Sequence, residues 1–126
     1  MSQPESPYAW IVDDSRSVRE SIRALLESCG LIVMDYASGP EFLDHFDPSA
    51  RGCLVADFHM PEMTGLELLE AVRARGSALP VIIITGKGDS LLAEQIARAG
   101  ALKMLHKPVD GDELLALVEP LMADPQ

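Results

Sequence analysis

Five polar residues stand directly after short apolar runs of the chain. They are Asp13, Asp14, Asp57, Thr85 and Lys107. Three carboxylates that lie close together repel one another and raise each other's pKa unless a cation is present. An oxygen-rich acidic cluster without His or Cys ligands suits Mg²⁺ or Mn²⁺.

Asp57 lies apart from the acidic pair in the sequence and is therefore available as a nucleophile. Aspartate carboxylates form covalent phosphoryl intermediates, and a metal ion can offset charge on both the carboxylate and the incoming phosphoryl group. Lys107 is a flexible point charge that suits a phosphoryl oxygen, and Thr85 offers a hydroxyl donor to another. The residue types thus predict phosphoryl transfer to Asp57.

The elements that must position these residues alternate along the chain. Compact apolar runs predict strands at Tyr8–Val12, Leu31–Tyr36, Cys53–Ala56, Val81–Ile84 and Lys103–His106. Helical patterns follow each run, marked by Gly30 as a C-cap, by capping pairs Ser38/Glu41, Thr64/Glu67 and Asp110/Glu113, and by a helix from about Ser90 to Ala99. Continuous apolar strands indicate a parallel sheet with helices on both faces. Such sheets bind ligands at the carboxyl ends of their strands, so the five polar residues should converge there.

Size and charge narrow the class of protein. The 126 residues fit one domain, which we expect at residues 8–122, between an N-terminal arm (1–7) and a C-terminal tail or start of a linker (123–126). A net charge of −10 and a pI of about 4.5 argue against direct binding of nucleic acid or anionic membrane. Cys29 and Cys53 lack metal-ligand spacing and are interpreted as small buried hydrophobes. With no signal-peptide pattern and no spanning segment, we expect a cytoplasmic protein.

Four motifs in order carry a resemblance to a known family. They are Val12–Ser15, Val55–Gly65, Ile84–Gly86 and Lys107–Pro108, each at a successive strand end. From about Tyr8 to Met122 the chain resembles the receiver domain of two-component response regulators. That resemblance implies a doubly wound (βα)5 flavodoxin-like α/β sandwich with strand order 2-1-3-4-5. It also implies a cis bond between Lys107 and Pro108.

The resemblance assigns a role to each site residue. Asp57 is expected to be the phosphoacceptor, and Asp13, Asp14, Asp57 and the backbone carbonyl of His59 to hold the metal. Thr85 is expected to be the switch hydroxyl and Lys107 the lysine that contacts the phosphoryl group. The domain would promote its own phosphorylation and dephosphorylation, without being an enzyme that acts on an external metabolite.

The resemblance also implies partners. The phosphoryl donor would be a sensor histidine kinase or a histidine phosphotransfer protein. The run from Ile84 to Asp89 is most similar to receivers joined to helix-turn-helix transcription domains of the nitrogen-fixation regulator type. Phosphorylation would switch the face built by the helix Ser90–Ala99, the strand Lys103–His106 and the last helix, for partner binding or a homodimer. Surplus apolar residues of the last helix, from Leu114 to Met122, predict exposed leucines on that face.

Several residues allow two readings. Met104 stands where receivers usually carry a Tyr or Phe switch residue, so we expect the Thr85–Asp89 loop to transmit the signal; Met104 could equally be a core residue. His59 and Lys87 could tune the lifetime of the acyl phosphate or be plain loop residues. His45 and His106 have no partners at catalytic spacing and are expected to be surface histidines.

Three other classes compete with a phosphorylated receiver. A pseudo-receiver would keep the fold without the phosphorylation, but the complete set of site residues argues against it. An aspartate-nucleophile phosphatase would place a second Asp two residues after the nucleophile, where this chain has His59. A flavin carrier would have a glycine- and hydroxyl-rich loop in place of Asp13 and Asp14, which would repel a phosphate.

Overall fold

The computed structural model describes residues 8–86 and 90–122, without the side chains of Ser90 and Met122. The expected arm (1–7) and tail (123–126), together with Lys87 and Asp89, lie outside the described residues. Within the described ranges, no helix has the length and apolar character needed to cross a bilayer.

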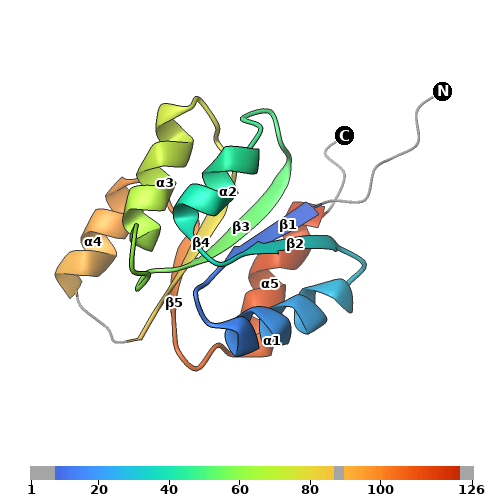
Figure 1. Ribbon diagram of the computed structural model, residues 1–126. Helices are drawn as coiled ribbons and strands as arrows, with labels where there is room; N and C mark the ends of the chain where they lie inside the picture. The colour runs from blue at the N-terminus through green and yellow to red at the C-terminus, as the bar shows by residue number, and fades with distance from the viewer. Residues whose placement is uncertain (1–7, 87–89, 123–126) are drawn as a thin grey trace.

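Strands and helices alternate along the chain (Figure 1). The strands are β1 (Tyr8–Val12), β2 (Ile32–Tyr36), β3 (Gly52–Asp57), β4 (Val81–Thr85) and β5 (Lys103–His106). The helices are α1 (Arg16–Glu27), α2 (Gly39–His45), α3 (Gly65–Ala74), α4 (Ser90–Arg98) and α5 (Gly111–Met122). The predicted alternation is confirmed, and β3 and β4 extend far enough to include Asp57 and Thr85 themselves.

The strands form one parallel sheet in the order β2-β1-β3-β4-β5, which confirms the expected topology. Helices α1 and α5 cover one face, and α2, α3 and α4 cover the other (Figure 1). Each face has its own apolar core, because successive strand residues point to opposite sides of the sheet. In β4, Ile82 and Ile84 therefore pack toward α1 and α5, whereas Val81 and Ile83 pack toward the other helices.

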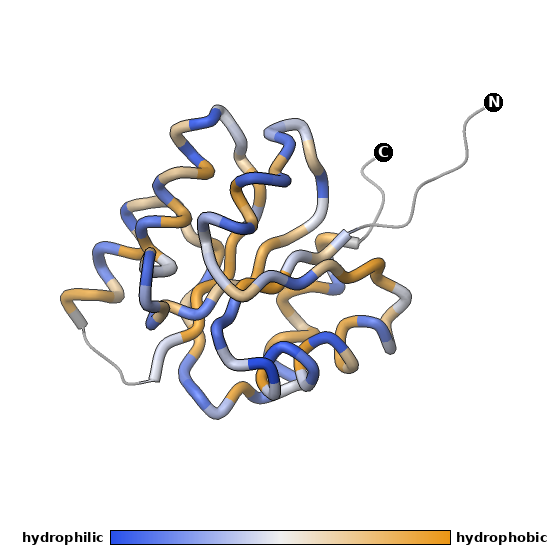
Figure 2. The backbone as a smooth tube through the Cα atoms, viewed as in Figure 1, coloured by the Kyte–Doolittle hydropathy of each residue, from blue (hydrophilic) through white to orange (hydrophobic). Residues whose placement is uncertain are grey.

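The central strands explain why the sequence shows continuous apolar runs. All residues of β3 from Cys53 onward and all of β4 are buried, and Figure 2 shows these strands as hydrophobic segments inside a more polar shell. Both faces of a parallel sheet are covered by helices, so no strand residue needs to be polar until the strand ends. Burial raises the pKa of the Cys53 thiol to about 12, which keeps it protonated and agrees with its interpretation as a core residue.

Side-chain caps start the helices close to where the sequence predicts. The Thr64 hydroxyl accepts from the Glu67 N–H (3.1 Å) while the Glu67 carboxylate accepts from the Thr64 N–H (2.9 Å), a complete capping box. Ser38 caps α2 by accepting from the Glu41 N–H (3.2 Å), but the Glu41 carboxylate accepts from Ala37 instead of Ser38. These caps fix the positions at which the chain leaves the sheet and turns into a helix.

The expectation of exposed leucines on α5 is wrong for the described side chains. Leu114 and Val118 are buried, and Leu115, Leu117 and Leu121 are half-buried against the core shared with α1. The surplus apolar residues are used because α5 packs in the angle between the sheet and α1, which needs more than a single stripe. On the face that the sequence pointed to, the exposed leucines are Leu91 of α4 and Leu102, which precedes β5.

Gly65 joins the end of β3 to the start of α3 at close range. Its N–H donates to the Phe58 carbonyl (3.0 Å). A Cβ added at Gly65 would lie 2.8 Å from the Asp57 carbonyl oxygen and 3.0 Å from the Phe58 Cα. Both are backbone atoms, which cannot move aside without shifting the strand end that carries Asp57.

We therefore expect Gly65→Ala to lower the free energy of unfolding by about 2 kcal/mol, a typical cost of overpacking. Gly111→Ala is the matched control, since its Cβ would make ordinary contacts of 3.4 and 3.5 Å with the Leu25 methyls at the start of α5. Urea denaturation followed by circular dichroism measures both. Equal stability of the two variants would show that the β3–α3 junction can accommodate a Cβ at Gly65, contrary to the short contact distances.

Candidate functional site

Four strand ends bring the predicted site residues to one edge of the sheet. Asp13 and Asp14 follow β1, Asp57 ends β3, Thr85 ends β4 and Lys107 follows β5. Main-chain hydrogen bonds continue the sheet past these ends: Asp13 N–H to the Tyr36 carbonyl (3.1 Å), and Lys107 N–H to the Thr85 carbonyl (2.8 Å). Main-chain hydrogen bonds therefore fix the backbone of the site both next to β2 and between β4 and β5.

The three aspartates form one cluster, with one carboxylate oxygen of each lying within 4.8 Å of the others. Asp13 and Asp57 are buried, and Asp14 is exposed. Burial raises the pKa of Asp13 above its ordinary value; the neighbouring Asp57 and Asp14 add to the increase, whereas a hydrogen bond from the Ser15 N–H (2.8 Å) and the charge of Lys107 oppose it. Desolvation and repulsion from the neighbouring carboxylates thus disfavour the ionised form of Asp13.

Lys107 compensates only part of this charge. Its Nζ lies 3.2 Å from Asp57 Oδ1, an ion-pair distance, but without the geometry of a hydrogen bond. Asp57 Oδ1 is consequently a buried carboxylate oxygen with no hydrogen-bond donor among the described residues. A buried acceptor without a hydrogen bond lowers the stability of the folded state. One ammonium group cannot neutralise three carboxylates, so the cluster keeps a net negative charge. Its ligand atoms are all oxygens, which suits a hard divalent cation.

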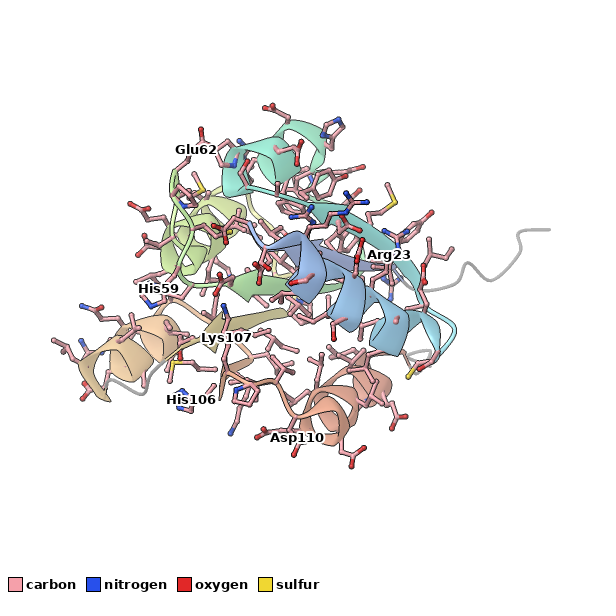
Figure 3. All side chains as sticks on the ribbon, turned by 60° about the horizontal axis from the view of Figure 1, so that its bottom comes forward. Arg23, His59, Glu62, His106, Lys107 and Asp110 are labelled. Carbon is pink, nitrogen blue, oxygen red and sulfur yellow. The ribbon has the colours of Figure 1, made fainter. Side chains whose placement is uncertain are left out.

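A network of charged side chains holds the backbone of Asp13. Arg19 donates from Nη1 to the Asp13 carbonyl (2.7 Å) and from Nε to Asp35 Oδ1 (3.2 Å). Arg23 of α1, labelled in Figure 3, also pairs with Asp35 of β2, and this hydrogen bond raises the pKa of the Arg23 guanidinium. The sequence did not point to Arg19, because its partners come from two separate strand ends and no local spacing relates them.

Thr85 is fully buried, and its Oγ1 lies 3.1 Å from Nδ1 of His106. The two residues face each other in the register of β4 and β5. His106 is exposed, as predicted for a surface histidine, but the expectation that it has no partner at the site is wrong. Aligning the ends of the two predicted strands would have placed His106 beside Ile84, whereas the observed register pairs it with Thr85, one residue further along β4.

The remaining predicted positions lie around this centre. Met104 is half-buried and packs against the core shared with α3 and α4. His59 is exposed on the loop after β3, with its ring edge-on to Phe58 at a centroid distance of 4.9 Å (Figure 3). The peptide bond between Lys107 and Pro108 is cis.

Comparison with known proteins places this arrangement in a family. The sequence profile of the response regulator receiver domain matches residues 9–119. The chain belongs to the response regulator receiver domain family. This receiver is 45% identical over 115 residues to the transcriptional regulatory protein FixJ of Azorhizobium caulinodans, which covers 91% of this chain and 54% of that protein.

A second sequence relative and a solved structure support the same family assignment. The response regulator protein TodT of Pseudomonas putida is 38% identical over 109 residues, covering 86% of this chain and 48% of TodT. The crystal structure of full-length FixJ from B. japonicum superimposes with a TM-score of 0.83 at 35% identity, over 94% of this chain and 58% of that one. The receiver thus spans about half the length of these relatives.

The raised pKa of Asp13 predicts that its charge destabilises the metal-free receiver. In buffer containing a chelator at pH 7, we expect Asp13→Asn to raise the free energy of unfolding by about 1 kcal/mol, a common size for a stabilising substitution. The Asn carbonyl still accepts from the Ser15 N–H, so only the charge is lost. Urea denaturation measures the difference, and Asp44→Asn, an exposed carboxylate of α2, is the control with no expected change.

The pH dependence has a definite sign. The folded pKa of Asp13 lies above the ordinary value of 3.8, so wild type gains stability relative to Asp13→Asn as the pH falls through that folded pKa. The difference in the free energy of unfolding between wild type and Asp13→Asn should therefore become smaller at acidic pH. A less stable Asp13→Asn protein at pH 7 would mean that the carboxylate is stabilised by its surroundings, contrary to the geometry described above.

Proposed function

We propose that this receiver accepts a phosphoryl group on Asp57 from a phosphohistidine of a sensor histidine kinase or histidine phosphotransfer protein. The observation that carries this proposal is the buried Asp57, whose Oδ1 has Lys107 at 3.2 Å and no hydrogen-bond donor among the described residues; one oxygen of its carboxylate also lies within 4.8 Å of oxygens of Asp13 and Asp14. A carboxylate with an oxygen free of hydrogen bonds, next to a cation, is suited to act as a nucleophile.

The transfer follows from the positions of the side chains. A carboxylate oxygen of Asp57 forms a bond to phosphorus while the donor's phosphorus–nitrogen bond breaks, and its electron pair stays with the histidine nitrogen. Lys107 then neutralises a phosphoryl oxygen, and the Thr85 hydroxyl donates to another. Hydrolysis of the acyl phosphate restores the carboxylate, so the receiver would promote both steps on itself without acting on an external metabolite.

Mg²⁺, or Mn²⁺ in its place, is the proposed cofactor. Asp13, Asp14, Asp57 and the backbone carbonyl of His59 would hold it. When bound, the ion would offset the charge of the cluster and of the incoming phosphoryl group. The Ser15 N–H and Arg19 would keep Asp13 in place, because the first donates to its carboxylate and the second to its carbonyl.

We infer the wider context from the relatives. The greater length of FixJ and TodT, and the name of FixJ as a transcriptional regulatory protein, support a receiver (residues 8–122) that controls an effector domain of transcription. The net charge of −10 supports a receiver that does not itself bind nucleic acid or anionic membrane, and we propose that it acts in the cytoplasm.

The phosphoacceptor is tested by intact mass. After incubation with Mg²⁺ and acetyl phosphate, we expect wild type to gain the mass of one phosphoryl group. Asp57→Asn should gain none, since its amide is not a nucleophile. Omitting Mg²⁺ should greatly reduce the adduct, because the charge of the cluster then opposes the approach of the donor.

Two outcomes would contradict the proposal. An adduct that persists in Asp57→Asn would place the phosphoryl group on another residue. If no adduct forms with acetyl phosphate or with phosphohistidine donors, although the protein is folded and binds Mg²⁺, the chain would be a pseudo-receiver.

Phosphorylation is proposed to switch the face of α4, β5 and α5 toward a homodimer or another partner. Leu91 of α4 supports this, since its side chain is 64% exposed and apolar. With beryllofluoride, a phosphoryl analogue, and Mg²⁺, we expect sedimentation velocity to show a dimer that Leu91→Glu weakens about tenfold or more, as for an interface anchor. Met34→Glu, on the exposed edge strand β2, is the control. A Leu91→Glu protein that dimerises like wild type would exclude this face.

The same measurement tests how the signal reaches that face. We propose that displacement of the loop after Thr85 transmits it more than Met104 does, because a flexible thioether has no sharply defined pair of rotamers. Met104→Ala should then leave both the adduct and the dimer in place. Loss of the dimer with an intact adduct would assign the transmission to Met104.

A further inference from the structure

The Thr85 hydroxyl is bound to His106. Oγ1 of Thr85 lies 3.1 Å from Nδ1 of His106, and Thr85 is fully buried. His106 immediately precedes Lys107, and Figure 3 shows the two side chains leaving the end of β5 in different directions. Lys107 thus contacts Asp57, and the adjacent His106 contacts the Thr85 hydroxyl, which is proposed to donate to the phosphoryl group.

The ends of β4 and β5 are joined by two contacts of different kinds. The main-chain bond from the Lys107 N–H to the Thr85 carbonyl (2.8 Å) extends the sheet. The bond between Thr85 and His106 joins two side chains. A side chain can change partner by rotation, whereas the main-chain bond can be lost only by parting the strands.

A threonine hydroxyl has a single proton to donate, and a phosphoryl oxygen can only accept. If Thr85 donates to Nδ1 of His106, its proton is already engaged. Donation from Thr85 to a phosphoryl oxygen then requires the contact with His106 to be given up. If Nδ1–H of His106 donates to Oγ1 instead, this contact does not use the Thr85 proton, so competition with a phosphoryl oxygen arises in the tautomer whose Nδ1 is unprotonated and accepts from Thr85.

We propose that His106 is a positioning residue that holds the Thr85 hydroxyl in the unphosphorylated receiver and thereby sets the resting bias of the switch. This inference rests on the function proposed for Asp57 and Thr85. A bond made in only one of two states favours that state, and its removal shifts the population toward the other. Loss of the His106 contact should therefore strengthen binding of a phosphoryl analogue.

The test compares dissociation constants for beryllofluoride at saturating Mg²⁺, measured by NMR titration of the wild-type chain and its variants. His106→Leu removes Nδ1, and we expect its dissociation constant to fall about three- to tenfold, the worth of one neutral hydrogen bond. His106→Asn places a polar amide atom near the position of Nδ1 and should restore a value close to wild type. His45→Leu removes an exposed histidine of α2 and should leave the constant unchanged.

A second set of variants separates positioning from a general structural effect. In a Thr85→Ala background there is no hydroxyl to hold, so His106→Leu should produce no further change in the constant. This double-mutant cycle isolates the coupling between the two side chains. Thermal unfolding of each variant without the analogue shows whether the protein is folded.

Three results would overturn the inference while leaving the proposed function intact. They are an unchanged or weaker affinity in His106→Leu, the same gain in the Thr85→Ala background, and a failure of His106→Asn to restore the wild-type value. Failure of wild type itself to bind beryllofluoride, with Mg²⁺ bound, would contradict the proposed function and remove the inference with it.

Discussion

The parallel register of β1, β3, β4 and β5 is the constraint on which the site depends. A parallel sheet brings the carboxyl ends of its strands to one edge, and residues that are far apart in sequence become neighbours there. Asp57 ends β3 opposite Ile84, so Thr85 follows one step further along β4 and faces His106 of β5. Because Lys107 follows β5 at the same edge, its Nζ lies 3.2 Å from Asp57 Oδ1.

This edge combines unfavourable electrostatics with a strongly apolar interior. The buried strands end at carboxylates whose mutual repulsion and desolvation oppose the ionised state, which is visible in the raised pKa of Asp13. The cost is tolerated because the cores on both faces of the sheet do not depend on the site. A carboxylate cluster that is unfavourable alone has free energy to gain from a bound divalent cation.

Much of this could be read from the sequence. The bounds of β1 and β5, the capping box of Thr64 and Glu67, and the polar residues at the strand ends all follow from local patterns. The exposure of the α5 leucines could not be predicted, because it depends on how closely α5 and α1 approach. The partners of Arg19 and His106 were missed for a related reason: each contact joins residues that only the pairing of distant strands brings together.

The two halves of the site are held with different firmness. On the side of β1, the Asp13 backbone is tied to β2 through Tyr36 and, through Arg19, to an aspartate of the same strand that Arg23 of α1 also grips. On the side of β4 and β5, the main chain is joined by the bond from the Lys107 N–H to the Thr85 carbonyl, and the side-chain contact between Thr85 and His106 involves an exposed ring. The Asp13 side can therefore act as a stationary reference while the Thr85 side chain changes partner. A change at Thr85 would reach β5 first, because β5 is the neighbour of β4 and lies at the edge of the sheet opposite β2 (Figure 1).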